Sequence, residues 1–351
     1  MVKRVTIKDI AANMGVSSGT VHRALNGKPG VGDELRERIL ETAREFGYRP
    51  NYVASSLKRK TLRIVAAFPG STEQNRYYYT YVWQGFRDCM EELQDYNLQV
   101  IEIPYYNTMN VQGHELTAVL ERYDHEIDGL ITVGHAHDER GEQAIRQFIQ
   151  EGIPVMLTCD DLYDSGRLGC VQANYQVTGR MVAELLSSQL PENSSVLIGA
   201  GDVMVPSHYG IIQGFDAYME ENDINLKTIK VHGYKDEEEI SLRMREYLNS
   251  DPSIRAIYSV NARGSVMIGN LVQEMGLQGK LRAIGSDLFD ENAANMKEGI
   301  LDNIIYKNPY QQAYLATRRL LDYLIKGEKP IEDVKYVQSV VLFRSNLSMY
   351  L

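Results

Sequence analysis

Apolar residues near the N-terminus recur with the spacing of short helices. Between Ile7 and Met14 they occupy positions i, i+3, i+4 and i+7, which lie on one face of a helix. Thr6 stands before this segment as a potential N-cap, and Gly15 ends it. Ser17 can cap a second helix that has a short apolar face of its own. The pattern therefore predicts two short helices separated by a tight turn.

The opposite face of the second predicted helix is polar. It carries small, polar and cationic residues: Ser18, Gly19, His22, Arg23 and Asn26. Small residues allow a helix to approach a DNA groove closely, and the planar guanidinium of an arginine can reach a base edge. With a third predicted helix over Val31–Phe46, this arrangement is typical of a helix-turn-helix DNA-binding domain.

After residue 61 the pattern changes to an alternation of strand-like and helical segments. Short apolar runs predict strands, and segments with helical periodicity, such as Pro309–Lys326, lie between them. The predicted strands are Arg63–Phe68, Leu98–Ile103, Gly129–Val133, Pro154–Leu157, Val196–Ala200, Thr228–His232, Ala256–Val260, Arg282–Gly285, Asn303–Tyr306 and Lys335–Phe343. About 290 residues are too many for one small domain, so the alternation predicts two α/β lobes with parallel sheets.

Charge is divided unevenly between the N-terminal segment and the rest. Residues 1–63 hold thirteen lysines and arginines against six aspartates and glutamates, whereas the whole chain holds 37 against 47. An acidic protein with one basic end is expected to meet polyanions through that end. A solvated basic tail would carry the same charge without the helical periodicity, so the two observations together favour DNA binding.

The apolar pattern disfavours membrane proteins and exported proteins. No apolar run reaches the eighteen residues of a membrane span, and the first residues lack the apolar core of a signal peptide. Cys89, Cys159 and Cys170 have no paired spacing, which favours a reducing compartment. We therefore expect a cytoplasmic protein without a membrane partner.

One ungapped motif covers the N-terminal segment. It runs from Thr6-Ile7-Lys8-Asp9-Ile10-Ala11 through Gly15-Val16-Ser17 and Arg23-Ala24-Leu25-Asn26 to Pro50-Asn51 and Ala54-x-x-Leu57. This stretch resembles the headpiece and hinge of the lactose/galactose repressor (LacI) family of bacterial transcription factors. The resemblance implies a helix-turn-helix headpiece at residues 1–49, a hinge at 50–61, and an effector-binding and dimerisation core at 62–351.

The same resemblance implies a set of DNA contacts. These are Thr6, Ser17, Ser18, Gly19, Thr20, His22, Arg23, Asn26, Tyr48, Asn51, Ala54 and Leu57. Residues 18, 19 and 23 would face bases, and residues 26, 48 and 51 would face phosphates. Leu57 would wedge into the minor groove. Because His22 and Gly19 depart from the usual family pattern, recognition is expected to depend more on Arg23, the hinge and DNA shape.

The core segment resembles the ligand-binding core of these regulators and of periplasmic sugar-binding proteins. The landmarks include Ile284-Gly285-Ser286-Asp287 and Ile305-Tyr306-Lys307-Asn308-Pro309. The resemblance implies two lobes joined by three crossovers, near residues 173, 287 and 308. It also implies that the lobes close on a ligand in a cleft lined by strand ends.

The predicted ligand-binding residues follow strands or form an aromatic cluster near a strand end. They are Tyr78, Tyr79, Trp83, His135, Asp160, Asn174, Tyr209, Asn261, Asp287 and Lys307. Aromatic rings can stack on a sugar face, although they also serve core or dimer packing, and either asparagine can instead cap a helix. Sugar-binding relatives usually have arginines near Ser207-His208 and an acid at Cys159. The effector is thus a sugar by resemblance alone, or another small polar metabolite.

Two other functions share parts of this pattern. A solute-binding protein has the same core but needs a signal peptide and no headpiece. An enzyme could use His135, His137 or Cys159, and His135-Ala136-His137-Asp138 is spaced like a short metal-binding cluster. A structural zinc site needs more ligands than this segment supplies, and Cys159 has no identified base. We therefore predict no catalytic residue, metal or cofactor, and a ligand-controlled repressor that binds a near-palindromic operator as a homodimer.

Overall fold

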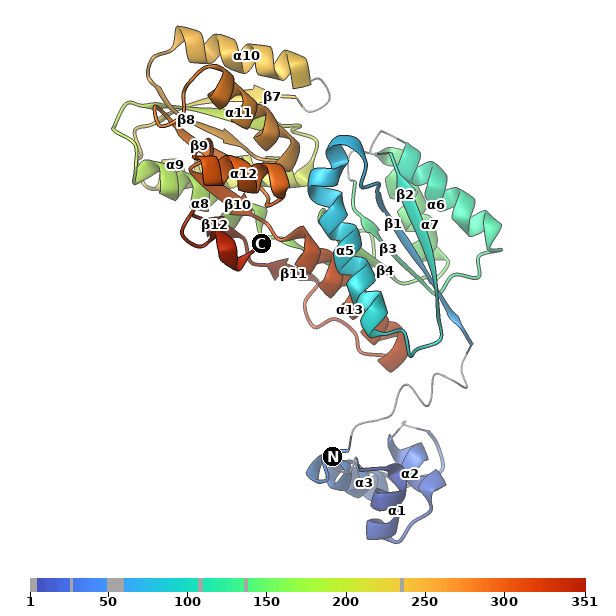
Figure 1. The fold of residues 1–351 in the computed structure, drawn as a ribbon. Coiled ribbons are helices and arrows are strands. Elements are labelled where there is room, and N and C mark those ends of the chain that lie inside the picture. The colour runs from blue at the N-terminus through green and yellow to red at the C-terminus, as the bar shows by residue number, and fades with distance from the viewer. Residues whose placement is uncertain (1–4, 26–27, 49–59, 107–109, 136–137, 234–236) are drawn as a thin grey trace. The chain divides into compact units, whose positions relative to one another are not determined.

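The chain folds as two compact units, Met1–Arg59 and Lys60–Leu351, each with its own hydrophobic core (Figure 1). The computed structural model describes residues 5–25, 28–48, 60–106, 110–135, 138–233 and 237–351. Most of the predicted hinge, residues 50–61, therefore lies outside the described residues.

The first unit is a headpiece of three helices: α1 (Ile7–Met14), α2 (Ser18–Leu25) and α3 (Asp33–Glu45). Each helix contributes a fully buried side chain to one small core, namely Ile10, Val21 and Ile39. Thr6 and Asp9 form a capping box that satisfies two backbone amides at the start of α1. The three helices predicted from the sequence are confirmed, with α3 beginning two residues later than its apolar pattern suggested.

The core contains two six-stranded sheets. The first sheet has the strand order β11-β5-β4-β3-β1-β2, and all of its pairs are parallel. Its strands are β1 (Leu62–Pro69), β2 (Leu98–Tyr105), β3 (Gly129–Val133), β4 (Val155–Thr158), β5 (Gly169–Ala173) and β11 (Val334–Val337). The helices against it are α5 (Arg76–Glu92), α6 (Val111–Arg122), α7 (Glu139–Gln150) and α13 (Pro309–Lys326), with α5 packed on α13 and α6 packed on α7. We call this layer structure the first lobe.

The second lobe is built in the same way around the order β12-β10-β9-β8-β6-β7. Its strands are β6 (Ser195–Gly201), β7 (Lys227–His232), β8 (Ile254–Ser259), β9 (Arg282–Ser286), β10 (Asn303–Tyr306) and β12 (Val340–Leu342). The pairs are parallel except for β12, which runs antiparallel to β10. One apolar cluster packs α8 (Tyr175–Ser187) and α9 (Pro206–Glu221) on the sheet, and another packs α10 (Glu237–Ser250), α11 (Ala262–Glu274) and α12 (Asp290–Glu298). The single-turn helices are η1 (Glu73–Asn75) and η2 (Leu347–Met349). The predicted fold class, an α-helical headpiece with a two-lobed parallel α/β core, is confirmed.

The chain passes between the lobes at three places. It crosses after β5 at residue 174, between β10 and α13 at residues 307–308, and between β11 and β12 at residues 338–339. Two of these places agree with the predicted crossovers near 173 and 308. Each crossover is only one or two residues long, so the two lobes are joined by three short segments.

The crossover predicted near residue 287 is wrong. The strands on either side of it, β9 and β10, are neighbours in one sheet and are joined by α12. The third crossover lies instead inside Lys335–Phe343, which the apolar pattern predicted as one strand. That segment is two short strands in two different sheets. Hydrophobic periodicity cannot reveal this break, because both strands are half-buried and follow each other after only two residues.

Candidate ligand cleft and DNA-reading headpiece

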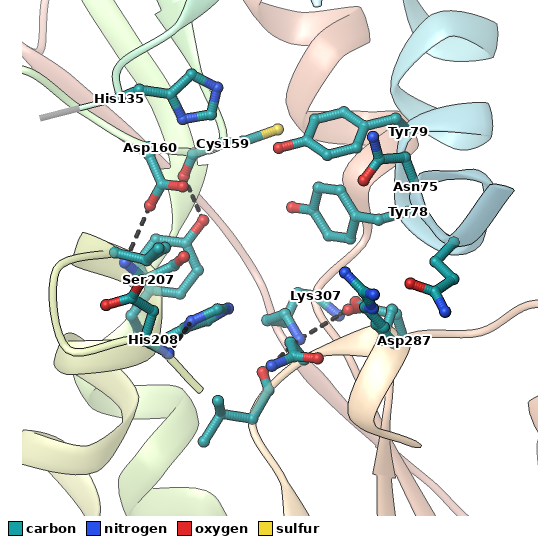
Figure 2. A pocket seen from close by; sticks show the side chains of 18 of the residues that line it. Asn75, Tyr78, Tyr79, His135, Cys159, Asp160, Ser207, His208, Asp287 and Lys307 are labelled. Atoms are coloured by element: carbon teal, nitrogen blue, oxygen red, sulfur yellow. Dashed lines mark hydrogen bonds and ion pairs between the residues drawn. The ribbon is translucent and has the colours of Figure 1, made fainter. Parts of the chain in front are cut away.

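A cavity of about 290 Å³ lies between the two lobes (Figure 2). It opens at the carboxyl ends of parallel strands, where open α/β sheets bind ligands. Seven of the ten predicted ligand-binding residues line it: Tyr78, Tyr79, His135, Asp160, Asn261, Asp287 and Lys307. Most of the predicted residues therefore lie in the cleft, while their roles in binding stay predictions.

Two sharp turns after buried strands direct acidic side chains into this cavity. β4 is followed by Cys159, which has a φ of 67°, and then by Asp160. β9 is followed by Asp287, which has a φ of 66°. Left-handed backbone is costly for most residues and is found where surrounding structure enforces it, often at functional sites. The turns bring one carboxylate from each lobe to the cleft.

Asp287 forms a buried ion pair with Lys307. The Nζ–Oδ2 distance is 2.7 Å, and the exposed fractions of the two side chains are 5% for Lys307 and 1% for Asp287. The lysine ammonium also donates to the backbone oxygen of Val260 at 3.4 Å, and the Lys307 amide donates to Oδ1 of Asp287 at 3.3 Å. The Oδ2 atom of Asp287 accepts no hydrogen bond from the described residues, so the ion pair with Lys307 is held mainly by the attraction between the two charges. The pair ties together the ends of β8, β9 and β10.

Asp160 links the two lobes. Its Oδ1 accepts a hydrogen bond from the backbone amide of Ser207 in the first turn of α9, at 2.9 Å. An acidic group at this place satisfies a free helix amide and meets the positive end of the helix. Burial raises the pKa of Asp160 to about 6, with Asp161 adding to the rise while Ser207 and Lys307 lower it. Asp160 is therefore a carboxylate that the cleft makes costly to ionise.

Two histidines flank Asp160 in the cavity wall (Figure 2). The His135 ring nitrogen Nε2 lies 2.9 Å from the hydroxyl of Tyr105. The Nδ1 atom of His208 accepts a hydrogen bond from the backbone amide of Asp202 at 3.1 Å. Because an acceptor nitrogen carries no proton, this contact fixes His208 as a neutral ring protonated on Nε2.

Three of the predicted ligand-binding residues lie outside the cavity lining. Trp83 is buried in the first lobe, where its indole donates to the backbone oxygen of Pro69 at 2.9 Å. Asn174 caps α8 by accepting from the amide of Val177 at 3.1 Å. Tyr209 lies on α9 and is 53% exposed. The packing and capping alternatives are thus the correct ones for Trp83 and Asn174. Asn261 lines the cavity and also caps α11, so its predicted role in ligand binding stays a prediction.

Several lining residues were not among the predicted ligand-binding residues. They share a position in the chain that the sequence pattern can indicate. They follow strand ends or begin helices on the cleft side: Asn75, Cys159, Tyr175, Asp202, Ser207, His208 and Arg263. In the sequence, Ser207 and His208 stand out only as a departure from sugar-binding relatives. Their position just after β6 would have placed them in the cleft.

The metal and nucleophile alternatives find no support in the described part of the chain. His137 lies outside the described residues, and no group of three or more His, Cys, Asp or Glu side chains there could hold a metal ion. Burial raises the pKa of the Cys159 thiol to about 12, so this thiol stays protonated at neutral pH. A protonated thiol is a poor nucleophile.

The headpiece exposes the predicted base-reading face of α2. Ser17, Ser18, Gly19, His22 and Arg23 are exposed, while Thr20 is half-buried. Ser17 caps α2 by accepting from the amide of Thr20 at 3.0 Å, and Thr6 belongs to the cap of α1. Tyr48 packs against the headpiece core. The predicted contacts Asn26, Asn51, Ala54 and Leu57 lie outside the described residues.

Comparisons with known proteins agree with this two-part architecture. Residues 6–51 match the profile of "Bacterial regulatory proteins, lacI family", and residues 65–329 match that of the "Periplasmic binding protein domain". The second match spans more than half of the chain, so the chain belongs to the periplasmic binding protein domain family, and its N-terminal segment is similar to the lacI family. None of the helices that the structure describes is long and apolar enough to span a membrane.

The relatives of this chain are distant in sequence. It is 24% identical over 225 residues to "Catabolite control protein A" of Priestia megaterium, an alignment that covers 64% of this chain and 63% of that protein. It is 23% identical to "HTH-type transcriptional regulator KdgR" of Bacillus subtilis, with 97% of both chains covered. The fold is similar to a Burkholderia graminis transporter solute-binding protein in complex with D-arabinose, with a TM-score of 0.73, 17% identity, and coverage of 83% of this chain and 98% of that chain.

Proposed function

We propose that this protein is a transcriptional repressor whose affinity for DNA is controlled by a small polar effector. The observation that carries the proposal is the presence, in one chain, of an exposed helix-turn-helix face and a two-lobed ligand cleft. The names of two relatives, a catabolite control protein and a transcriptional regulator, support it. Acting on the bacterial chromosome, the protein would work in the cytoplasm.

The headpiece would place α2 in the major groove. Arg23 is exposed on that helix, and its guanidinium can form two hydrogen bonds with a guanine edge. A homodimer would present two such helices, so the operator would be a near-palindrome with half-sites about one helical turn apart. Ser18 and Gly19 would let the helix approach the bases closely.

Replacing Arg23 with alanine tests the reading of DNA by α2. A DNA site is first obtained by selecting from a random pool with the full-length protein. Arg23→Ala is expected to weaken binding to this site by about 1–3 kcal/mol and to relax selection at one base pair in each half-site. Fluorescence anisotropy titrations at several salt concentrations measure both effects.

The matched control is Arg44→Ala, which removes the same charge from the end of α3. It should weaken selected and random DNA by similar small factors, because a charge that meets only the phosphate backbone carries no sequence information. If Arg23→Ala also weakens both DNAs equally, Arg23 does not read bases and α2 is not the recognition helix.

The cleft would hold the effector between the lobes. Tyr78 and Tyr79 come from α5 in the first lobe, while Asn261, Asp287 and Lys307 come from the second lobe and its crossover. A ligand that contacts both lobes stabilises their closed arrangement. It shifts the equilibrium between the open and closed arrangements only by the difference in its affinity for the two. The arabinose-bound relative of similar fold supports a sugar-like effector. A solute-binding protein without a DNA role is not favoured, since the headpiece would then have no purpose.

A further inference from the structure

Among the described residues that line the ligand cavity, acidic side chains outnumber basic ones. Four carboxylates line it, Asp138, Asp160, Asp202 and Asp287, against two cationic side chains, Arg263 and Lys307. Both cations already have carboxylate partners: Lys307 pairs with Asp287, and Arg263 pairs with Glu237 of α10. His208 is neutral in the hydrogen-bonded arrangement described above. Among the lining residues that the structure describes, no lysine or arginine therefore remains without a carboxylate partner to meet an anionic ligand.

Asp160 is the carboxylate most in need of compensation. It is 6% exposed and forms no ion pair with the described residues. Its hydrogen-bond donor is Ser207, which comes from the opposite lobe. An isolated buried carboxylate is costly because it has lost water without gaining a counter-ion. Asp138, by contrast, receives two backbone amides, from Gly141 at 3.0 Å and Asn110 at 2.8 Å.

Anionic, neutral and cationic ligands differ in how well they would compensate the buried charge of Asp160. A uronic acid would add a negative charge beside carboxylates in a low-dielectric cavity, where like charges repel strongly. A neutral sugar could donate hydroxyl hydrogens but would leave the excess charge in place. An ammonium group would supply both the hydrogen-bond donor and the missing positive charge.

We propose that the effector is a small polyhydroxylated compound carrying an ammonium group, such as an amino sugar, with this group placed against Asp160. This proposal rests on the function proposed above and specifies the ligand class of the same cleft. The tyrosine rings and hydroxyls of Tyr78 and Tyr79 face Asp160 and Cys159 across the cavity (Figure 2). They supply aromatic surface for the ring of the ligand and polar groups for its hydroxyls.

A panel of sugars matched in ring and different in charge tests the proposal. Glucose, galactose and mannose are each titrated as the neutral hexose, the 2-amino-2-deoxyhexose and the uronate, into the full-length protein at pH 7.0 by calorimetry. At least one amino sugar is expected to bind ten-fold or more tightly than its neutral partner, and its uronate is expected to bind more weakly still. The proposal is overturned if no amino sugar binds, or if a neutral or anionic member binds as tightly as its amino partner.

Two variants separate the local effect of Asp160 from general electrostatics. Asp160→Asn keeps the shape of the side chain and an acceptor for Ser207, and it should remove the preference for the amino sugar. Asp216→Asn removes a carboxylate from α9 whose partner is Lys230, outside the cavity, and should leave the preference intact. An unchanged preference in Asp160→Asn would overturn the proposal.

The same protein preparation distinguishes failure of the ligand class from failure of the proposed function. Binding to the selected DNA site is measured without any sugar. If DNA binding is specific and the panel fails, the ligand class alone is wrong. If DNA binding is itself unspecific, the function as a regulator is wrong, whatever the panel shows.

Discussion

Replacing Lys307 with methionine is expected to lower the free energy of unfolding by about 3–5 kcal/mol, because it leaves Asp287 buried without its counter-ion. The two side chains are almost completely inaccessible, and their charges are 2.7 Å apart. Methionine keeps an unbranched side chain that is only one atom shorter than lysine, so the change removes the charge while altering the packing little. Chemical unfolding of the full-length protein, followed by circular dichroism, measures the loss.

A double variant provides the control for this prediction. Lys307→Met combined with Asp287→Asn removes both charges, and it should regain most of the lost stability because a buried pair contributes little net stability over a neutral pair. The coupling free energy between the two sites is read from the double-mutant cycle. A loss below about 1 kcal/mol in the single variant would mean that water reaches Asp287 and that this end of the cleft is not dry.

Replacing Asp160 with asparagine is expected to stabilise the protein at neutral pH. Burial raises the pKa of Asp160 from its ordinary value of 3.8 to about 6. The folded state then binds more protons than the unfolded state between about pH 4 and 6, so the free energy of unfolding falls as pH rises through this window. The difference in pKa corresponds to roughly 3 kcal/mol above pH 6. The asparagine variant carries no charge there and avoids this cost.

The measurement compares the unfolding free energies of wild type and Asp160→Asn from pH 4 to pH 7.5. The difference should be near zero at pH 4 and grow with pH until it levels off above pH 6. The groups that act on Asp160 from other segments are Ser207 and Lys307, with Asp161 adjacent, and none of them is changed. A pH-independent difference would show that Asp160 is solvated and that its ionisation is not costly.

Two acidic residues of the cleft, Asp160 and Asp287, show how far the sequence predicts the site. The sequence predicts Asp160 and Asp287 as cleft residues because each lies just after a strongly apolar strand, and the carboxyl ends of parallel strands meet at one edge of a sheet. Trp83 was misplaced because an aromatic residue near a strand end can turn either into the cleft or into the core. Its helix, α5, turns Trp83 against Phe68 while Tyr78 on the same helix reaches the cavity.

Other features depend on contacts between distant segments, which local patterns do not contain. Asp160 bonds to Ser207 across the lobes, 47 residues away in sequence. Arg167 has a guanidinium that is 4% exposed and pairs with Asp161 nearby and with Asp333, which lies just before β11. Burial tends to lower the pKa of this arginine, but its bonds to Asp161 and Asp333 outweigh burial and raise the pKa overall. The periodicity of apolar residues does not indicate which charged side chains the fold will bury.

The central claim is that ligand binding in the cleft changes the affinity of the headpiece for DNA. The most direct test titrates the full-length protein with its selected DNA site at increasing concentrations of the compound that binds the cleft most tightly. We expect the DNA affinity to change by about 5- to 150-fold, equivalent to roughly 1–3 kcal/mol, and the DNA to change the affinity for the compound by the same factor. If a compound saturates the cleft and leaves the DNA affinity unchanged, the cleft and the headpiece are not coupled and the account is contradicted.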